Sequence, residues 1–238
     1  MKAIILAAGR GSRMKRLTEE KPKGLVVFRG RPLLDWQLSS LRDSGITEIA
    51  IVTGYQHQLF ASFGLVEFHN HRWSETNMVS SLACASEWLN KEPCIVSYSD
   101  IFYEPGAASI LMNANADLAV TYDKNWRTLW ESRFGDPLLD AESFRLDRNN
   151  GTLLEIGKKP RNVDEIEGQY MGLLRFTPKG WGEVTRIRKG LSKDIRDQMD
   201  MTGTLQRVIE EGRVPVMAIS YDAKWGEVDS ESDLRAYD

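Results

Sequence analysis

The sequence predicts an α/β protein with a Rossmann-like sheet that is mixed, mainly parallel and flanked by helices. A short apolar run, Ala3–Ala8, ends in a glycine-rich segment, which is typical of a buried strand that enters a loop. A helical pattern follows, and a second apolar run, Glu48–Thr53, comes soon after it. Strand, helix and strand with short links form the βαβ unit, so we expect parallel neighbours and right-handed crossovers.

The loop Gly9–Arg13 predicts a phosphate-binding site at the carboxyl end of the first strand. Its glycines let backbone N–H groups approach an anion, and Arg13 and Lys23 supply the cations that hold a triphosphate. Two commoner motifs do not fit. Met14 stands where a dinucleotide fingerprint has its third glycine, and Gly24 stands where a P-loop has serine or threonine. A tight turn with a solvated basic flank is the alternative interpretation.

Composition restricts the partners of this protein. Its 238 residues are 42% hydrophobic, which is enough for one sizeable core, and we expect a single domain over residues 1–238. A net charge of -3 predicts no nucleic-acid or membrane partner, so the ligand should be small. Two cysteines, no signal peptide and no membrane-spanning run favour the cytoplasm. The sequence leaves open whether the chain forms a homo-oligomer.

The first helix should begin near Pro32 and end at Gly45, with three leucines on its apolar face: Leu34, Leu38 and Leu41. A short strand is expected at Val66–Phe68, followed by His69-Asn70-His71. The spacing of two puts both imidazoles on one side of an extended segment. They are either a metal-binding pair or structural surface residues, and no third ligand with suitable spacing accompanies them in the sequence.

A further helix, Met78–Leu89, should begin at Asn77, which is a preferred N-cap residue. Because this helix opens at the end of a strand, its first N–H groups should point into the site. The next apolar strand, Cys94–Asp100, ends in an aspartate. A carboxylate at this place, facing the triphosphate loop, suits a Mg²⁺ ion, although such aspartates also cap helices and turns. A strand carrying Val228 should bring Asp229 to the same ion.

The strand Asp117–Tyr122 and the residues after it should form the acceptor side of the site. Trp126 and Trp130 are four residues apart, as on one face of a helix, and lie close in sequence to Tyr122 and Asp123. Aromatic rings beside a carboxylate are suited to an alkylammonium group. Equally, the two tryptophans can pack in a core flap or a subunit contact.

The remaining elements are a β-hairpin and its supports. Ser143–Ile156 should be the hairpin, with Asn150-Gly151 as its turn. A strand from Glu167 to Phe176 follows. Two helices and a strand are expected after it, at Lys179–Lys189, Leu205–Glu211 and Val214–Ile219, and the polar stretch Lys193–Asp200 is assigned no chemistry.

Four segments together resemble the nucleotidyltransferase family that makes activated sugars and activated phosphocholine. They are Leu6–Met14 with Lys21-Pro22-Lys23, the Glu75-Thr76-Asn77 segment with Ser80-Ser81-Leu82, Trp225–Asp229 with Asp233-Leu234, and Gly157-Lys158-Lys159-Pro160. The second and third segments are most similar to choline-phosphate and aminoethylphosphonate cytidylyltransferases. Lys158 departs from the pattern, because sugar nucleotidyltransferases have a glutamate there.

The resemblance implies a fold of the nucleotide-diphospho-sugar transferase type and a role for each segment. Residues 1–116 would form the nucleotide half and residues 117–238 the acceptor half. Lys23 and Arg13 would be catalytic, and Asp100 and Asp229 would bind Mg²⁺. The nucleotide would contact Leu6, Ala7, Ala8, Gly9, Gly11, Ser12, Thr76, Asn77, Ser80 and Ser81. The acceptor would contact Tyr122, Asp123, Trp126, Trp130, Lys159 and Tyr170.

The implied reaction transfers CMP from CTP to a phosphocholine-like or aminoalkylphosphonate acceptor and releases pyrophosphate. A phosphomonoester has a second pKa of about 6, so it is already a nucleophilic dianion and needs no general base. The absence of a catalytic His, Ser or Cys constellation is therefore expected. The alternatives are a sugar-1-phosphate nucleotidyltransferase and a catalytically silent nucleotide-binding regulatory protein.

Overall fold

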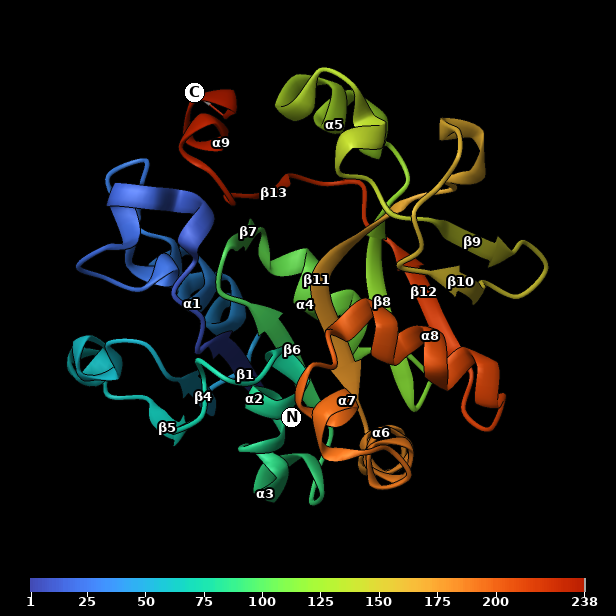
Figure 1. The fold of residues 1–238 in the computed structure, drawn as a ribbon, viewed down its shortest axis with the longest axis horizontal. Helices are drawn as coiled ribbons and strands as arrows, with labels where there is room; N and C mark the ends of the chain where they lie inside the picture. Colours follow the sequence, from blue (N-terminus) through green and yellow to red (C-terminus); the bar gives the residue numbers. More distant parts are fainter. Residues whose placement is uncertain (238) are drawn as a thin grey trace.

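A nine-stranded mixed sheet forms the centre of the protein in the computed structural model, which describes residues 1–237 (Figure 1). Its strand order is β5-β4-β1-β6-β11-β8-β12-β10-β9. The strands are β1 (Lys2–Ala7), β4 (Ile49–Thr53), β5 (Val66–His69), β6 (Cys94–Tyr98), β8 (Leu118–Asp123), β9 (Phe144–Asp147), β10 (Thr152–Ile156), β11 (Gln169–Phe176) and β12 (Val216–Ser220). Two small sheets pair β2 (Val27–Phe28) with β3 (Arg31–Pro32) and β7 (Ile101–Tyr103) with β13 (Trp225–Glu227).

The strand directions confirm the predicted fold class. β4 and β6 both run parallel to β1, and β12 runs parallel to β8. Only β11 and β10 run against the other strands of the large sheet, as the antiparallel pairings on both sides of each show. The sheet is therefore mixed and mainly parallel, and the apolar runs that predicted β1, β4 and β6 are buried in its middle.

Helices cover both faces of the large sheet (Figure 1). One face carries α1 and α4, which pack against each other, and the other carries α2, α6 and α8. The helices are α1 (Leu33–Asp43), α2 (Met78–Ala83), α3 (Ser86–Leu89), α4 (Pro105–Met112), α5 (Trp126–Phe134), α6 (Pro178–Lys189), α7 (Lys193–Asp197), α8 (Met201–Glu211) and α9 (Glu231–Ala236). Shorter 3₁₀ segments are η1 (Ser12–Thr18), η2 (Lys23–Leu25), η3 (His57–Phe63), η4 (Pro137–Leu139) and η5 (Val163–Glu165).

Two sequence expectations are corrected here. The helix expected over Met78–Leu89 is divided into α2 and α3, because Ala85 has a non-helical backbone and Ser86 Oγ bonds to the carbonyl of Ala83. Pro32 precedes α1 as its N-cap and belongs to β3. The polar stretch after Ser192 forms the short helix α7.

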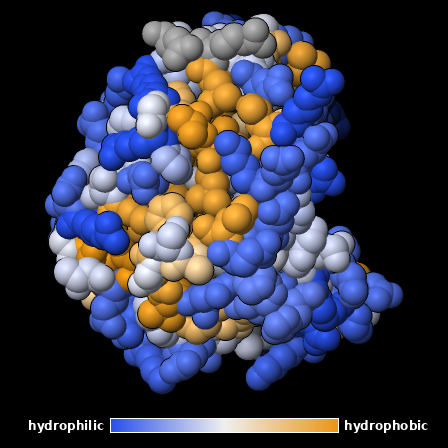
Figure 2. All heavy atoms as spheres, turned by 90° about the vertical axis from the view of Figure 1, so that its left-hand side faces the viewer, coloured by the Kyte–Doolittle hydropathy of each residue, from blue (hydrophilic) through white to orange (hydrophobic). Residues whose placement is uncertain are grey.

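The surface has both polar and apolar regions. Figure 2 shows the left-hand side of Figure 1, where hydrophobic side chains gather in a band between hydrophilic ones. Among the described residues, no helix combines the length and apolar character needed to cross a lipid bilayer.

Candidate functional site

The glycine-rich loop after β1 borders a cavity of about 290 Å³. Arg13, Lys23, Asp100 and Asp229 all line it. So do eight of the predicted nucleotide-binding residues: Leu6, Ala8, Gly9, Gly11, Ser12, Thr76, Asn77 and Ser81. The structure thus brings the loop, the start of α2 and the two aspartates to one place, which lies at the carboxyl ends of parallel strands.

The Lys23 side chain packs against the backbone of the glycine-rich loop at Gly11. Gly11 has a φ of 72°, in the left-handed region that favours glycine, and it is the N-cap of η1. A Cβ at this position would lie 2.8 Å from Lys23 Cβ. Gly11 is therefore required both for the turn and for the passage of the lysine side chain toward the carboxylates.

A small hydrophobic cluster brings the distant end of the chain to this loop. Val228 packs with Met14, Phe28 and Phe102, and all four are buried. β13 pairs with β7, and the Val228 N–H donates to the Asp100 carbonyl over 2.8 Å. These contacts hold Asp229 next to Asp100, although the two residues are far apart in the sequence.

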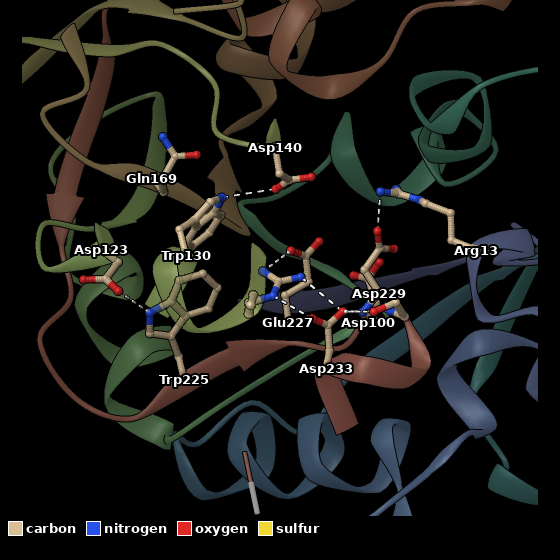
Figure 3. Close-up of polar contacts among 12 residues, drawn as sticks. Arg13, Asp100, Asp123, Trp130, Asp140, Gln169, Trp225, Glu227, Asp229 and Asp233 are labelled. Carbon is tan, nitrogen blue, oxygen red and sulfur yellow. Dashed lines mark hydrogen bonds and ion pairs between the residues drawn. The ribbon is translucent and has the colours of Figure 1, made fainter. Parts of the chain in front are cut away.

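Three carboxylates face one another at the centre of the site. Oxygen atoms of Asp100, Glu227 and Asp229 all lie within 4.8 Å of one another (Figure 3). Burial, together with the negative charge of Asp100, raises the pKa of the Glu227 carboxyl to about 7. Burial lowers the pKa of the Lys23 ammonium, but Asp100 and Asp229 raise it, and the net shift is upward. The lysine is therefore a permanent cation here.

Lys23 and Arg13 contact this cluster from two sides. Lys23 Nζ donates to Asp100 Oδ2 over 2.7 Å and also bonds Asp229 Oδ1. Arg13 forms an ion pair with Asp229 Oδ2, and its side chain remains 73% exposed. Arg13 is consequently free to contact a ligand, whereas Lys23 is held in the interior.

The donor set fits a hard divalent cation. Within residues 1–237, the buried Asp100 Oδ1 has no hydrogen-bond partner. A buried carboxylate oxygen without a partner is costly, and an ion bound by several carboxylate oxygens would satisfy it. The chemistry of the residues thus agrees with the ion expected from the sequence.

Arg133 of α5 supports the acidic cluster from behind, and sequence reasoning missed it. Its side chain is fully buried and pairs with Glu227 and Asp233, each over 2.9 Å. Asp233 Oδ2 in turn accepts the backbone N–H of Asp229 over 2.9 Å. Arg133 therefore orients two acidic residues on either side of Val228.

A second cavity, of about 310 Å³, opens beside the first. Five carboxylate side chains line it: Asp140, Glu142, Asp200, Glu227 and Asp229. Arg13 is the one arginine among its lining residues, which include no lysine. Burial raises the pKa of Glu142. The cavity therefore combines an excess of carboxylates with aromatic and aliphatic lining, and it is cationic only where Arg13 enters it.

Two tryptophans form an aromatic wall of this second cavity. The ring centroids of Trp130 and Trp225 lie 6.3 Å apart. Each indole N–H donates to a carboxylate: Trp130 to Asp140 over 3.1 Å and Trp225 to Asp123 over 3.0 Å (Figure 3). The carboxylates fix the orientation of the rings, which are 4% and 8% exposed.

The structure places several predicted acceptor residues elsewhere. Trp130 and Tyr170 line the second cavity, but Tyr122, Asp123, Trp126 and Lys159 do not. Trp126 is 4% exposed and packs in the core, and Tyr122 packs on Phe144. Lys159 Nζ bonds the carbonyl of Leu138 on the surface. Asp123 acts on the cavity only through Trp225. The helical spacing of four between Trp126 and Trp130 did not specify which of the two tryptophans faces the cavity.

Two predicted nucleotide residues also lie outside the first cavity. Ala7 is buried in β1 and contributes no lining surface. Ser80 faces the other way, because its hydroxyl bonds Arg188 and the carbonyl of Arg196. Trp73, Tyr98 and Ser99 line the cavity and were missed. The sequence signal for Ser99 was its position next to Asp100 at the end of a strand.

The two cavities meet at one point. Arg13, Met78, Tyr98 and Asp229 line both of them. A glycine-rich loop, an acidic cluster and two adjoining cavities at the carboxyl edge of an open α/β sheet are the arrangement expected of a transferase that brings two substrates together.

Comparison with known proteins agrees with this class. Residues 3–214 match the model of the MobA-like NTP transferase domain, and the chain belongs to this family of nucleotidyltransferases. It is 37% identical to the CTP:phosphoglutamine cytidylyltransferase of Campylobacter jejuni over 98% of both chains. It is 38% identical to the choline-phosphate cytidylyltransferase of Streptococcus pneumoniae over 37% of this chain and 41% of that protein.

Solved structures support the fold. The inositol-1-phosphate CTP transferase from T. maritima aligns with a TM-score of 0.78 and 20% identity, over 98% of this chain and 90% of that one. The CTP:phosphocholine cytidylyltransferase from Streptococcus pneumoniae aligns with a TM-score of 0.74 and 22% identity, over 99% and 96%. The fold and the family inferred from the sequence are thereby confirmed.

Proposed function

We propose that this protein transfers CMP from CTP to the phosphate or phosphonate of a small acceptor that carries an ammonium group. The observation that supports this most is the meeting of the two cavities at Arg13 and Asp229. A nucleotide in the first cavity and an acceptor in the second would have their phosphates at that junction. The acidic and aromatic wall of the second cavity suits a positively charged acceptor.

In this reaction an acceptor oxygen attacks the α-phosphorus of CTP, the bond to the β-phosphate bridge oxygen breaks, and pyrophosphate leaves with that bond's electron pair. Both reactants are anions, so the main task of the protein is to neutralise converging charge. Arg13 lies at the junction and Lys23 lies beneath the glycine loop, and we assign both to this task. The loop and the tryptophan wall would hold the two substrates in line.

Asp100 and Asp229, with Glu227 beside them, would hold Mg²⁺. When bound, the ion would supply positive charge to the triphosphate. Lys23 bonds both aspartates and so balances part of their negative charge. We place the reaction in the cytoplasm, because Cys84 and Cys94 are both free thiols.

Known relatives suggest which acceptors to test. One relative acts on phosphoglutamine and another on choline phosphate, and both acceptors combine a phosphate with a cationic nitrogen. The decisive experiment measures pyrophosphate release with Mg²⁺ from CTP, UTP, GTP and dTTP, each with phosphoglutamine, phosphocholine, aminoethylphosphonate and glucose 1-phosphate.

We expect release only with CTP and an ammonium-bearing acceptor, and no release by the Lys23→Ala variant. Release restricted to glucose 1-phosphate would instead identify a sugar-1-phosphate nucleotidyltransferase. Tight nucleotide binding without release for any acceptor would identify a silent regulatory protein. Either result would contradict the proposal.

A further inference from the structure

All three histidines of the chain lie together at one edge of the large sheet. His57 begins η3, His69 ends β5, and His71 lies in the turn that follows. The ring centroids of His57 and His69 are 4.2 Å apart, and those of His69 and His71 are 4.4 Å apart. Sequence reasoning could pair only His69 with His71, whereas the fold adds His57 from a separate element.

A carboxylate completes this group. Glu67 Oε1 lies 3.1 Å from His57 Nδ1 and 3.9 Å from His69 Nδ1. Donor atoms of Glu67, His57 and His69 all lie within 4.8 Å of one another. Donors that share one tetrahedral Zn²⁺ ion at about 2 Å lie roughly 3 to 4 Å apart, so this group needs only small side-chain adjustments.

The buried strand β4 holds the group in place. Thr53 is fully buried, and its hydroxyl donates to Glu67 Oε1 and lies 3.0 Å from His69 Nδ1. The hydroxyl thus orients the carboxylate and one imidazole at the same time. Because the Thr53 hydroxyl donates its proton to Glu67, His69 Nδ1–H would donate to Thr53, and His69 would offer the ion its other ring nitrogen, Nε2, as zinc-bound histidines with an outer-sphere partner do.

We propose that His57, Glu67 and His69 bind a divalent transition metal ion, with Zn²⁺ as the best match. Imidazole and carboxylate ligands suit Zn²⁺, whereas the all-carboxylate cluster of Asp100, Glu227 and Asp229 suits a hard ion such as Mg²⁺. The two sites are therefore chemically distinct.

The metal site would stabilise the hydrogen-bond network that supports the nucleotide cavity. The Thr53 carbonyl accepts the Asn70 N–H over 2.8 Å. The Asn70 side chain then donates to Thr76 Oγ1 and Ser81 Oγ, each over 3.0 Å, and both of these residues line the cavity. An ion bound to residues of both η3 and β5 would restrict the movement of these two elements, which lie beside this network.

Imidazole NMR tests the proposal directly. Because the chain has three histidines and all belong to this group, every imidazole signal of the untagged protein reports on it. We expect one equivalent of Zn²⁺, added in excess Mg²⁺, to shift the signals of His57 and His69, while Mg²⁺ alone leaves them unchanged. Imidazole signals that do not respond to Zn²⁺ would overturn the proposal.

Affinity measurements with variants give a second test. Competition with a chelating dye, in excess Mg²⁺, should show that His57→Ala and His69→Ala each weaken Zn²⁺ binding by more than about 100-fold, and that Thr53→Val weakens it about 10-fold. The control Asp229→Asn should retain Zn²⁺ binding although it loses transferase activity. Unchanged affinity in a folded His57→Ala, His69→Ala double variant would refute the site and leave the proposed transferase function untouched.

Discussion

Gly11 and Lys23 are coupled at the scale of single residues. The Lys23 side chain passes so close to Gly11 that a Cβ on this glycine would lie 2.8 Å from Lys23 Cβ. Beyond this point the side chain reaches Asp100 and Asp229. The same glycine has a positive φ. Gly11 therefore allows the Lys23 side chain to pass close to the loop backbone and reach the acidic cluster.

Gly11→Ala should displace Lys23 and reduce kcat at least 10-fold, with a loss of about 1 to 2 kcal/mol in unfolding free energy from the left-handed backbone. Steady-state kinetics and urea unfolding measure the two effects. Gly64→Ala is the matched control, because Gly64 has a φ of 63° but a Cβ there would meet no other atom within 4 Å. It should lose similar stability and keep kcat. Equal kcat losses in both variants would contradict the coupling.

Asp197 is a second residue with a defined electrostatic role. Hydrogen bonds from Arg72 and Lys193 lower the pKa of this carboxyl from 3.8 to about 2. Its backbone carbonyl accepts the N–H of Asn77 over 2.7 Å, so Asp197 also joins α7 to the start of α2. A depressed folded-state pKa contributes stability above about pH 4, and this contribution is lost as the pH falls through about 2.

Asp197→Asn should therefore lower the unfolding free energy at pH 7 but match the wild type near pH 2. Urea unfolding at several pH values measures the difference. Asp194→Asn in the same helix is the control, since Asp194 has no ion pair among residues 1–237. A gap between Asp197→Asn and the wild type that stays constant down to pH 2 would contradict the assignment.

At the scale of elements, α5 joins the acidic cluster to the acceptor cavity. Trp130 faces the cavity, Trp126 faces the core, and Arg133 pairs with Glu227 and Asp233. The Arg133 guanidinium also lies 5.3 Å from the Trp130 ring. One helix thus supplies the aromatic wall, its packing support and the cation that orients the acids.

Arg133→Met should destabilise the protein by about 3 to 5 kcal/mol, because it removes the guanidinium that pairs with the buried Asp233 and the partly buried Glu227. Arg127→Met is the matched control on the same helix. Arg127 is 60% exposed and pairs with Glu131 over 2.8 Å, and such surface pairs contribute about 0.5 kcal/mol or less. Urea unfolding at pH 7 gives both values, and similar losses in the two variants would show that Arg133 is not essential to the cluster.

Trp130→Leu should raise the KM for an ammonium-bearing acceptor at least 10-fold and leave the KM for CTP unchanged, because the indole faces only the acceptor cavity. Trp126→Leu should lose stability but keep the acceptor KM. Initial-rate kinetics with each substrate varied would show the distinction. An acceptor KM that depends on both tryptophans would restore the arrangement expected from the sequence, and one that is independent of Trp130 would contradict the prediction.

At the scale of the whole molecule, a single sheet joins the nucleotide and acceptor halves. β6 of the first half pairs with β11 of the second over four residues of register. β13 returns to pair with β7 of the first half (Figure 1). The site lies where these two connections bring the halves together.

The shared sheet predicts one cooperative unfolding transition. Amide hydrogen exchange in mild urea should show that β1 and β8 open with the same free energy. The strands of one half cannot unfold without exposing the buried strands of the other half to solvent. Mass spectrometry of peptides from both strands provides the measurement. A half that exchanges at a clearly lower free energy would show that residues 1–116 and 117–237 are separate folding units.

Much of this fold follows from local sequence patterns. The apolar runs at β1, β4 and β6 and the Asn150-Gly151 turn were predictable because each depends on neighbours in the chain. The phosphate loop and the pairing of Asp100 with Asp229 were predictable from motifs that resemble a known family. These features predicted the class of enzyme, which the family match confirms.

Only the tertiary structure decided the composition of the acceptor cavity and of the histidine site. Trp225 and Glu227 line the second cavity because β13 pairs with the distant strand β7, and no periodicity within one element predicts such a pairing. His57 and Glu67 likewise meet through the adjacent ends of η3 and β5. Periodicity determines which face of an element is apolar, whereas the strand order determines which faces meet, and that order depends on contacts between residues distant in the sequence.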